Sequence, residues 1–154
     1  MSKGSRRVLE FVEEKGIDAR IVTLGDSTQT SHLAAEALGC MVAEIAKSVV
    51  FLSGNSPVVV VISGDRRVDT KKLGAVVGAK VSNADAESVR LRTGYVIGGV
   101  PPFPHDSGVR VLLDRSLTRF DRVWSAAGTP HSVMSVAVPT LAETVGGGFV
   151  DVAS

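Results

Sequence analysis

Lys47 is a charged residue in an otherwise apolar stretch, and it is the first candidate for chemistry. It follows Ile45 and Ala46 and precedes the apolar residues 49–51, at the entry to a predicted inner strand. A lysine in this place can bury its aliphatic stem and present its ammonium at the end of a sheet. It can equally extend into water without any role. Taken by itself, the position of Lys47 favours the second interpretation.

The loop that begins at Gly98 is the second candidate. Gly98 and Gly99 allow the backbone to approach a ligand closely, and the prolines between residues 101 and 104 stiffen the rest of the loop. Exposed backbone N–H and C=O groups on such a loop could hold an ester carbonyl or a ribose. Small residues at 126–129 end a predicted strand and leave backbone groups accessible in the same way. A plain surface turn and a tight strand exit remain the alternative interpretations.

Histidines and basic residues give weaker signals. His105 and His131 are possible acid–base groups because an unperturbed imidazole titrates near neutral pH. Cys40 follows a predicted helix end among apolar neighbours, which favours a buried and unreactive thiol. A basic cluster could contact the phosphates of a nucleic acid or could simply be a solvated helix face. Its members are Arg66, Arg67, Lys71, Lys72 and Lys80, with Arg90 and Arg92 as further candidates.

Several common motifs are missing, and their absence narrows the possible chemistry. The sequence has no phosphate-binding G-x-x-x-x-G-K-[ST], no dinucleotide-binding G-x-G-x-x-G after a strand and no G-x-S-x-G nucleophile elbow. The three histidines and the single cysteine have no short spacing typical of zinc ligands. We therefore expect no metal and no other cofactor.

The elements that must position these residues alternate irregularly, which favours an α+β arrangement or a mixed sheet over a regular series of βαβ units. The run 58–62 has no polar alternation and predicts a central strand buried on both faces, paired with strand 48–52 through the turn 53–57. Capping-box patterns at Ser82-x-x-Asp85 and Thr140-x-x-Glu143 predict two helix starts. The remaining predicted helices cover 5–15, 31–39, 42–46 and 70–73, and the remaining strands cover 18–24, 109–113, 122–126 and 132–137.

The bulk composition indicates one globular domain. The chain has 154 residues, of which 44% are hydrophobic and 21% charged, and its formal net charge is +1. Apolar runs stay well below the roughly 18 residues of a membrane-spanning helix. The charged, amphipathic N-terminus does not resemble a signal peptide. We expect a soluble, cytoplasmic protein with no membrane partner and no DNA partner.

Taken in order, several segments resemble the YbaK/ProX family of aminoacyl-tRNA editing domains. The two most specific pieces are the lysine before a strand and the G-Y-x-x-G-G-x-x-P loop. The resemblance spans about residue 20 to about residue 145, nearly the whole chain. The similar segments are 31–39, 45–51, 68–73, 93–102, 126–128 and 139–141.

This resemblance implies an α+β fold with a mixed, partly barrel-like sheet and flanking helices, over one editing domain at residues 1–154. It implies metal-independent hydrolysis of the ester that links a wrong amino acid to its tRNA. The expected substrate is alanine or cysteine on a proline tRNA. Backbone groups would position the ester, and water or a substrate group would attack. A synthetase is a further candidate partner. We expect catalytic groups at Lys47, Gly98, Gly99 and Gly128, substrate contacts at Thr30, His32, Pro101, Pro102, Ala126 and His131, and tRNA contacts at Arg66, Arg67, Lys71 and Lys72.

Two segments depart from the family pattern and leave the substrate open. Residues 101–105 are richer in proline than the usual loop, and Thr129-Pro130-His131 replaces a more basic stretch. Two alternatives therefore stay open besides the deacylase. One is a non-catalytic module that binds tRNA or a nucleotide with the same fold, and the other is a hydrolase of another small acyl ester.

Overall fold

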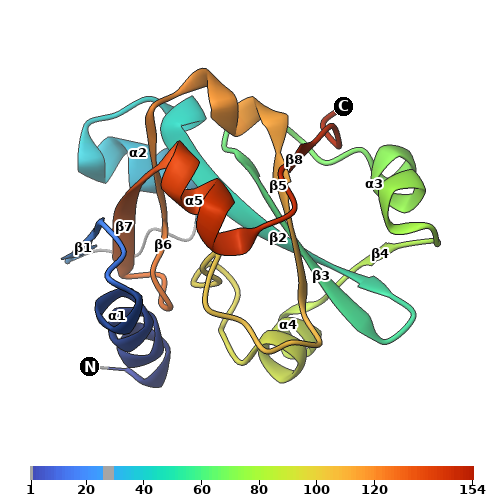
Figure 1. Ribbon diagram of the computed structural model, residues 1–154, viewed down its shortest axis with the longest axis horizontal. Coiled ribbons are helices and arrows are strands. Elements are labelled where there is room, and N and C mark those ends of the chain that lie inside the picture. Colours follow the sequence, from blue (N-terminus) through green and yellow to red (C-terminus); the bar gives the residue numbers. More distant parts are fainter. Residues whose placement is uncertain (1, 26–29) are drawn as a thin grey trace.

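A mixed β-sheet with helices packed on both faces forms the centre of the computed structural model, which describes residues 2–25 and 30–154 (Figure 1). The α-helices of this part of the chain are α1 (Lys3–Lys15), α2 (Ser31–Leu38), α3 (Thr70–Val77), α4 (Ala86–Thr93) and α5 (Val138–Val145), with 3-10 helices η1 (Val42–Glu44) and η2 (Arg115–Arg119). The strands are β1 (Ala19–Thr23), β2 (Ile45–Ser53), β3 (Ser56–Ser63), β4 (Ser82–Asn83), β5 (Arg110–Asp114), β6 (Arg122–Ala126), β7 (Ser132–Ala137) and β8 (Phe149–Val150).

The strand order is β1-β7-β6-β2-β3-β5-β8, and β4 pairs with β2 beside this path. The β2–β3, β6–β7 and β1–β7 pairs are antiparallel, whereas β2–β6, β3–β5 and β5–β8 are parallel. Among the described residues β1 and β8 are the two ends of this order, so the sheet is open. The predicted α+β class with a mixed sheet and flanking helices is confirmed.

Strand β3 is the most deeply buried element, as its uninterrupted valines predicted. Val59 and Val61 face a core shared with α1, α4 and α5, whereas Val58, Val60 and Ile62 face a second core that includes Leu73 of α3. A strand covered on both sides needs no polar face, which explains its composition. A third, smaller cluster packs α2 against Ile45 at the start of β2 and Trp124 of β6.

The two predicted capping boxes are wrong in detail. Ser82 lies in β4 and pairs with Leu52, so α4 is capped by Asp85 alone, which accepts from the Ser88 N–H at 2.8 Å. Helix α5 begins at Val138, with a proline at its first positions, so Thr140 lies inside the helix. A proline is well suited to the first helical turn because it lacks the N–H that would be unsatisfied there. Sequence spacing alone could not tell this start from the capping box.

The other predicted elements are found within a few residues of their expected bounds. The helical turn expected over 42–46 ends earlier, because Ile45 and Ala46 already pair with β6 in the sheet. Within the described residues, none of the helices has the length and apolar character needed to cross a membrane.

Candidate functional site

Strand β2 leaves part of one edge unpaired in the middle of the sheet, and this gap is the starting point of the site. β6 pairs only with Ile45 and Ala46, and β4 pairs only with Phe51 and Leu52. The segment 47–50 therefore has β3 on one side and no registered strand partner on the other. Such a gap leaves backbone hydrogen-bonding groups of an inner strand open to a ligand.

The backbone direction along β2 identifies which groups face the gap. The Ile45 carbonyl accepts from Gly64 N–H on the β3 side at 2.7 Å, whereas the Val50 carbonyl accepts from Ala84 N–H on the β4 side at 3.1 Å. Successive residues of a strand point their N–H and C=O groups to opposite edges. Ser48, which has the same parity as Val50, thus directs its backbone N–H and C=O toward the gap.

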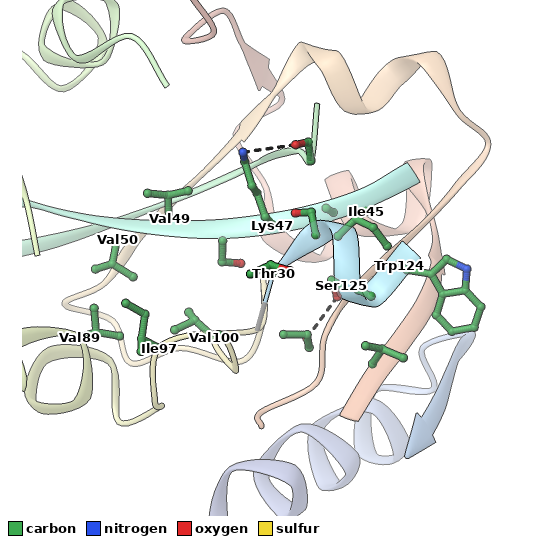
Figure 2. Close-up of a pocket in the computed structure, with 18 of the residues that line it drawn as sticks. Thr30, Ile45, Lys47, Val49, Val50, Val89, Ile97, Val100, Trp124 and Ser125 are labelled. Carbon is green, nitrogen blue, oxygen red and sulfur yellow. Dashed lines mark hydrogen bonds between the residues drawn. The ribbon is translucent and has the colours of Figure 1, made fainter. Parts of the chain in front are cut away.

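A cavity of about 470 Å³ lies across this open edge (Figure 2). Figure 2 shows Lys47 extending from one side of β2, whereas Val50, Val89 and Val100 lie on the other. The cavity consequently has a charged end and an apolar end, with the Ser48 backbone between them. Its lining residues are Thr30, Ser31, His32, Ala34, Ile45, Ala46, Lys47, Ser48, Val49, Val50, Gly64, Asn83, Ala84, Val89, Ile97, Gly98, Val100, Trp124, Ser125, Ala126 and Val133.

Lys47 marks the charged end of the cavity. Its Nζ donates to the carbonyl oxygen of Gly64 at 3.5 Å, a long hydrogen bond that leaves donor capacity for a ligand. Burial lowers the pKa of Lys47 from its usual value, the positive charge of Arg67 lowers it further, and the negative charge of Asp65 opposes both. Removing a charge from water makes it interact more strongly with any anion or carbonyl that arrives.

The walls of the apolar end come from four parts of the fold. Val50 lies on β2, Val89 on α4, Val100 in the loop after α4, and Val133 on β7. Two serines add polar groups: the Ser48 hydroxyl oxygen is buried without a hydrogen-bond partner, and the Ser125 hydroxyl donates to the Ala126 carbonyl at 3.3 Å. This end therefore combines apolar walls with two serine hydroxyl groups.

The glycine loop contributes in two different ways. Gly98 lines the cavity and has φ 84°, a left-handed conformation that glycine adopts without strain. Gly99 and Gly128 are not among the lining residues. Gly128 N–H donates to the Gly99 carbonyl at 3.0 Å, and a Cβ on Gly99 would lie 2.7 Å from the Cα of Thr129. These two glycines hold the loop against the β6–β7 turn.

The predicted substrate contacts separate into two groups. Thr30, His32 and Ala126 line the cavity. Pro101, Pro102 and His131 do not: Pro101 accepts a hydrogen bond from the His105 ring, Pro102 lines a separate cavity of about 260 Å³, and His131 is exposed in the turn between β6 and β7. The second cavity lies beside α1 and the end of α5.

The predicted tRNA contacts lie along the segment that follows Gly64. Arg66, Arg67 and Lys71 are exposed. The Lys72 ammonium already donates to the Ala153 carbonyl at 2.8 Å and lies 3.3 Å from the Asp151 carboxylate. Arg67 is close enough to influence the pKa of Lys47, so positive charge continues from the cavity onto the surface.

Several lining residues were not foreseen from the sequence. Ser48 follows the candidate lysine directly, yet its importance depends on a gap that only the pairing of distant strands creates. Ala84 and Val89 reach the cavity because β4 attaches to the far end of β2. Among residues 2–25 and 30–154, histidine, cysteine, aspartate and glutamate side chains form no group of three or more that could hold a metal ion.

Comparison with known proteins identifies the family and agrees with the fold. Residues 26–144 match the family described as Aminoacyl-tRNA editing domain, so the chain belongs to that family. It is a family of aminoacyl-tRNA deacylases, which are ester hydrolases.

Particular relatives cover most of the chain. It is 36% identical over 118 residues to the uncharacterized protein YwhH of Bacillus subtilis, which is 76% of this chain and 75% of that protein. It is 29% identical to the multifunctional Ser/Thr-tRNA deacylase ProXp-y of Escherichia coli, over 83% of this chain and 81% of that one. The crystal structure of a candidate trans-editing enzyme for prolyl tRNA synthetase superposes with a TM-score of 0.91 at 34% identity, covering 100% of this chain and 99% of that one.

Proposed function

We propose that this protein is a trans-editing deacylase, which hydrolyses the ester between a wrong amino acid and the 3′ end of a tRNA. The observation that carries the proposal is the cavity across the open edge of β2. Its charged end at Lys47 and its apolar end at Val50, Val89 and Val100 suit the two parts of an aminoacyl ester. Membership in the editing-domain family supports the same reaction.

In the proposed complex the terminal nucleotide lies at the Lys47 end and the amino acid side chain enters the apolar end. The ester then crosses β2 near the backbone N–H and C=O of Ser48, which have no registered strand partner. Backbone donors in such a place can stabilise the oxyanion that forms when water attacks the ester carbon. The bond from that carbon to the ribose oxygen breaks, and the free amino acid and the tRNA 3′ hydroxyl are released.

The role of Lys47 follows from its position rather than from nucleophilicity. Its ammonium is bonded to the Gly64 carbonyl and stands beside the exposed Arg67. We infer that it binds a phosphate or ribose oxygen of the terminal nucleotide and polarises the site. Gly98 contributes backbone to the wall, and Gly99 and Gly128 fix that wall in place. Because an aminoacyl ester is already activated, positioning and oxyanion stabilisation can supply much of the acceleration without a metal.

For the amino acid, we propose alanine or cysteine attached to a proline tRNA. The apolar end is bordered by valines and alanines and suits a side chain of that size. Serine and threonine are the competing substrates, because the relative ProXp-y is named as a Ser/Thr-tRNA deacylase and Ser48 and Ser125 are among the residues that line this cavity. A hydrophobic pocket discriminates weakly between side chains that differ by one methylene, about 1–3 kcal/mol, so one protein can accept several small residues.

The tRNA would lie over Arg66, Arg67 and Lys71, with Lys72 as an additional contact. Thr30 and His32 line the same cavity as Lys47, and His131 lies on the exposed turn after β6. A synthetase that releases the mischarged tRNA is the proposed partner. Stimulation of deacylation by added prolyl-tRNA synthetase would test that partnership.

The deciding experiment measures the release of amino acid from proline tRNA charged with alanine, cysteine, serine or threonine, with and without EDTA. We expect turnover of at least one of these substrates, unchanged by EDTA. Lys47→Ala should abolish most of the turnover while tRNA binding persists. Lys15→Ala, which removes an exposed lysine from the end of α1, is the matched control and should retain turnover. Tight tRNA binding without turnover of any substrate would instead favour the non-catalytic module.

A further inference from the structure

An arginine on η2 forms a two-pronged ion pair with the residue that follows Gly64. Arg119 Nη2 lies 2.7 Å from Asp65 Oδ1, and Arg119 Nη1 lies 3.1 Å from Asp65 Oδ2. Its Nε also donates to the Ser116 carbonyl at 2.8 Å, so all three guanidinium nitrogens form hydrogen bonds. Arg119 does not line the cavity, and sequence analysis gave it no role.

The ion pair holds the turn that carries the acceptor of Lys47. Residues 63–66 form this turn, which is closed by a hydrogen bond of 3.0 Å from Arg66 N–H to the Ser63 carbonyl. The Ser63 N–H donates to the Ser116 hydroxyl at 3.2 Å. Helix η2 therefore contacts the turn at two points: Ser116 is hydrogen-bonded to Ser63, and Arg119 is paired with Asp65.

Helix η2 is itself a firm support. The buried Asp114 accepts from the Ser116 N–H and the Val152 N–H, each at 2.9 Å, and thereby joins β5, η2 and the C-terminal segment. Leu117 of the same helix is fully buried in the main core. A side chain fixed to such a support can hold a neighbouring loop in one position.

The other side of the turn is packed equally closely. A Cβ on Gly64 would lie 2.5 Å from the Val42 carbonyl oxygen and 2.8 Å from the Ser31 Cβ. Gly64 is thus packed against α2 and η1 through its α-carbon, and its neighbours Ser63 and Asp65 are bonded to η2. Its position, and with it the direction of the Lys47 ammonium, depends on both contacts.

We propose that Arg119 is a positioning residue of the editing site, which holds Asp65 and the 63–66 turn so that the Gly64 carbonyl directs Lys47 into the cavity. This inference rests on the proposed function of Lys47. Asp65 is the carboxylate that acts on Lys47 electrostatically, and Arg119 engages both of its oxygens. Without Arg119 that carboxylate is free to pair with Lys47 and withdraw the ammonium from the substrate.

If the Arg119–Asp65 pair only supported the fold, its loss would affect turnover no more than it affects stability. The two side chains are each 34% exposed, and ion pairs this exposed contribute roughly 0–1 kcal/mol to folding. Loss of the pair should therefore change the melting temperature very little. A large effect on turnover with a small effect on stability distinguishes positioning from structural support.

The experiment compares Arg119→Ala, Arg119→Lys, Asp65→Ala and the double variant, with Arg115→Ala as the control on the same helix. The Arg115 guanidinium lies 3.4 Å from the Asp151 carboxylate, and replacing Arg115 by alanine removes the same charge as replacing Arg119. For Arg119→Ala we expect kcat to fall roughly 10- to 100-fold with little change in KM, as misplaced catalytic groups produce. Arg119→Lys should recover part of this loss, and the double variant should be no worse than Arg119→Ala. Arg115→Ala should keep wild-type turnover.

A second measurement tests the positioning independently of turnover. The Lys47 ammonium can be followed by NMR after reductive methylation with ¹³C-formaldehyde, and its titration gives its pKa. Arg119→Ala should raise the pKa of Lys47, because Asp65 is no longer neutralised, whereas Asp65→Ala should lower it. An unchanged Lys47 titration in both variants would overturn the positioning role, even if the protein hydrolyses no tested tRNA. A wild-type protein without turnover but with these opposite shifts would refute the deacylase and retain the positioning.

Discussion

Gly128 donates its backbone N–H to the Gly99 carbonyl over 3.0 Å, and this bond joins the cavity loop to the turn between β6 and β7. Gly99 is buried, and its α-carbon faces the backbone of Thr129. The two glycines expected to act at the ester therefore have different roles. Gly98 lines the cavity, and Gly99 allows the loop backbone to approach the backbone of Thr129. Side chains at Gly99 should harm the site through packing.

We predict that Gly99→Ala destabilises the protein and lowers deacylation together. The new Cβ would lie within 3.0 Å of three Thr129 backbone atoms, none of which belongs to a flexible side chain. Overpacking of this kind typically costs roughly 1–3 kcal/mol. Urea unfolding and deacylation assays measure both effects. Gly108→Ala is the matched control, since its Cβ meets nothing within 4 Å, and it should behave as wild type. Equal stability of the two variants would contradict the prediction.

Replacing Lys47 by methionine should lower turnover without lowering the stability of the fold at pH 7. Methionine keeps most of the apolar stem but loses the ammonium, so kcat should fall roughly 100-fold, as when one electrostatic donor is removed from a site. The folded-state pKa of Lys47 lies below 10.5, so between these two values the unfolded state binds more protons. The wild type therefore gains stability as the pH rises through that window.

The methionine variant should lack this gain and should be no less stable than the wild type at pH 7. Urea unfolding between pH 7 and about pH 10.5, the unperturbed lysine value, compares the two proteins. A methionine variant that is clearly less stable at pH 7 would show that the ammonium supports the fold.

The positive surface beside the cavity should show itself in the salt dependence of tRNA binding. Arg67 is exposed next to Lys47, so Arg67→Ala should reduce the slope of log Kd against log salt by about 0.7–0.9, the value for one lost phosphate contact. Lys72 is held by Ala153 and Asp151, so Lys72→Ala should alter the slope less and lower the melting temperature instead. Binding titrations at several salt concentrations decide this, and equal slopes for both variants would contradict it.

Much of the fold could be predicted from local patterns in the sequence. The hairpin of β2 and β3 was predicted because the valine run 58–62 and the turn before it are strong local signals. Lys47 was selected by its apolar surroundings and by resemblance to a family. The cavity could not be predicted, because it exists only where Ile45 and Phe51 meet different strands on one edge of β2. Arg119 was missed for the same reason, since its partner Asp65 is distant in sequence.

Protonation of His105 should make the stability of the folded protein depend on pH. Its Nε2 lies 2.7 Å from the Pro101 carbonyl, which can only accept, so the proton is on Nε2. The Nδ1 atom is buried without a hydrogen-bond partner, so protonating it places an unpaired N–H in the interior. Burial lowers the pKa of His105 below 6.5, Arg7 lowers it as well, and the Pro101 hydrogen bond and Asp106 oppose both.

Because the folded-state value is the lower one, the unfolded chain binds the proton first as the pH falls. The contribution of His105 is therefore fully present above about pH 6.5 and is lost as the pH falls from there toward the folded-state pKa. His105→Gln keeps an N–H donor for Pro101 but does not titrate. We expect the unfolding free energy of the wild type to fall more than that of His105→Gln between about pH 7 and pH 5, in urea titrations at each pH. Parallel losses in the two proteins would assign the acid sensitivity to other groups.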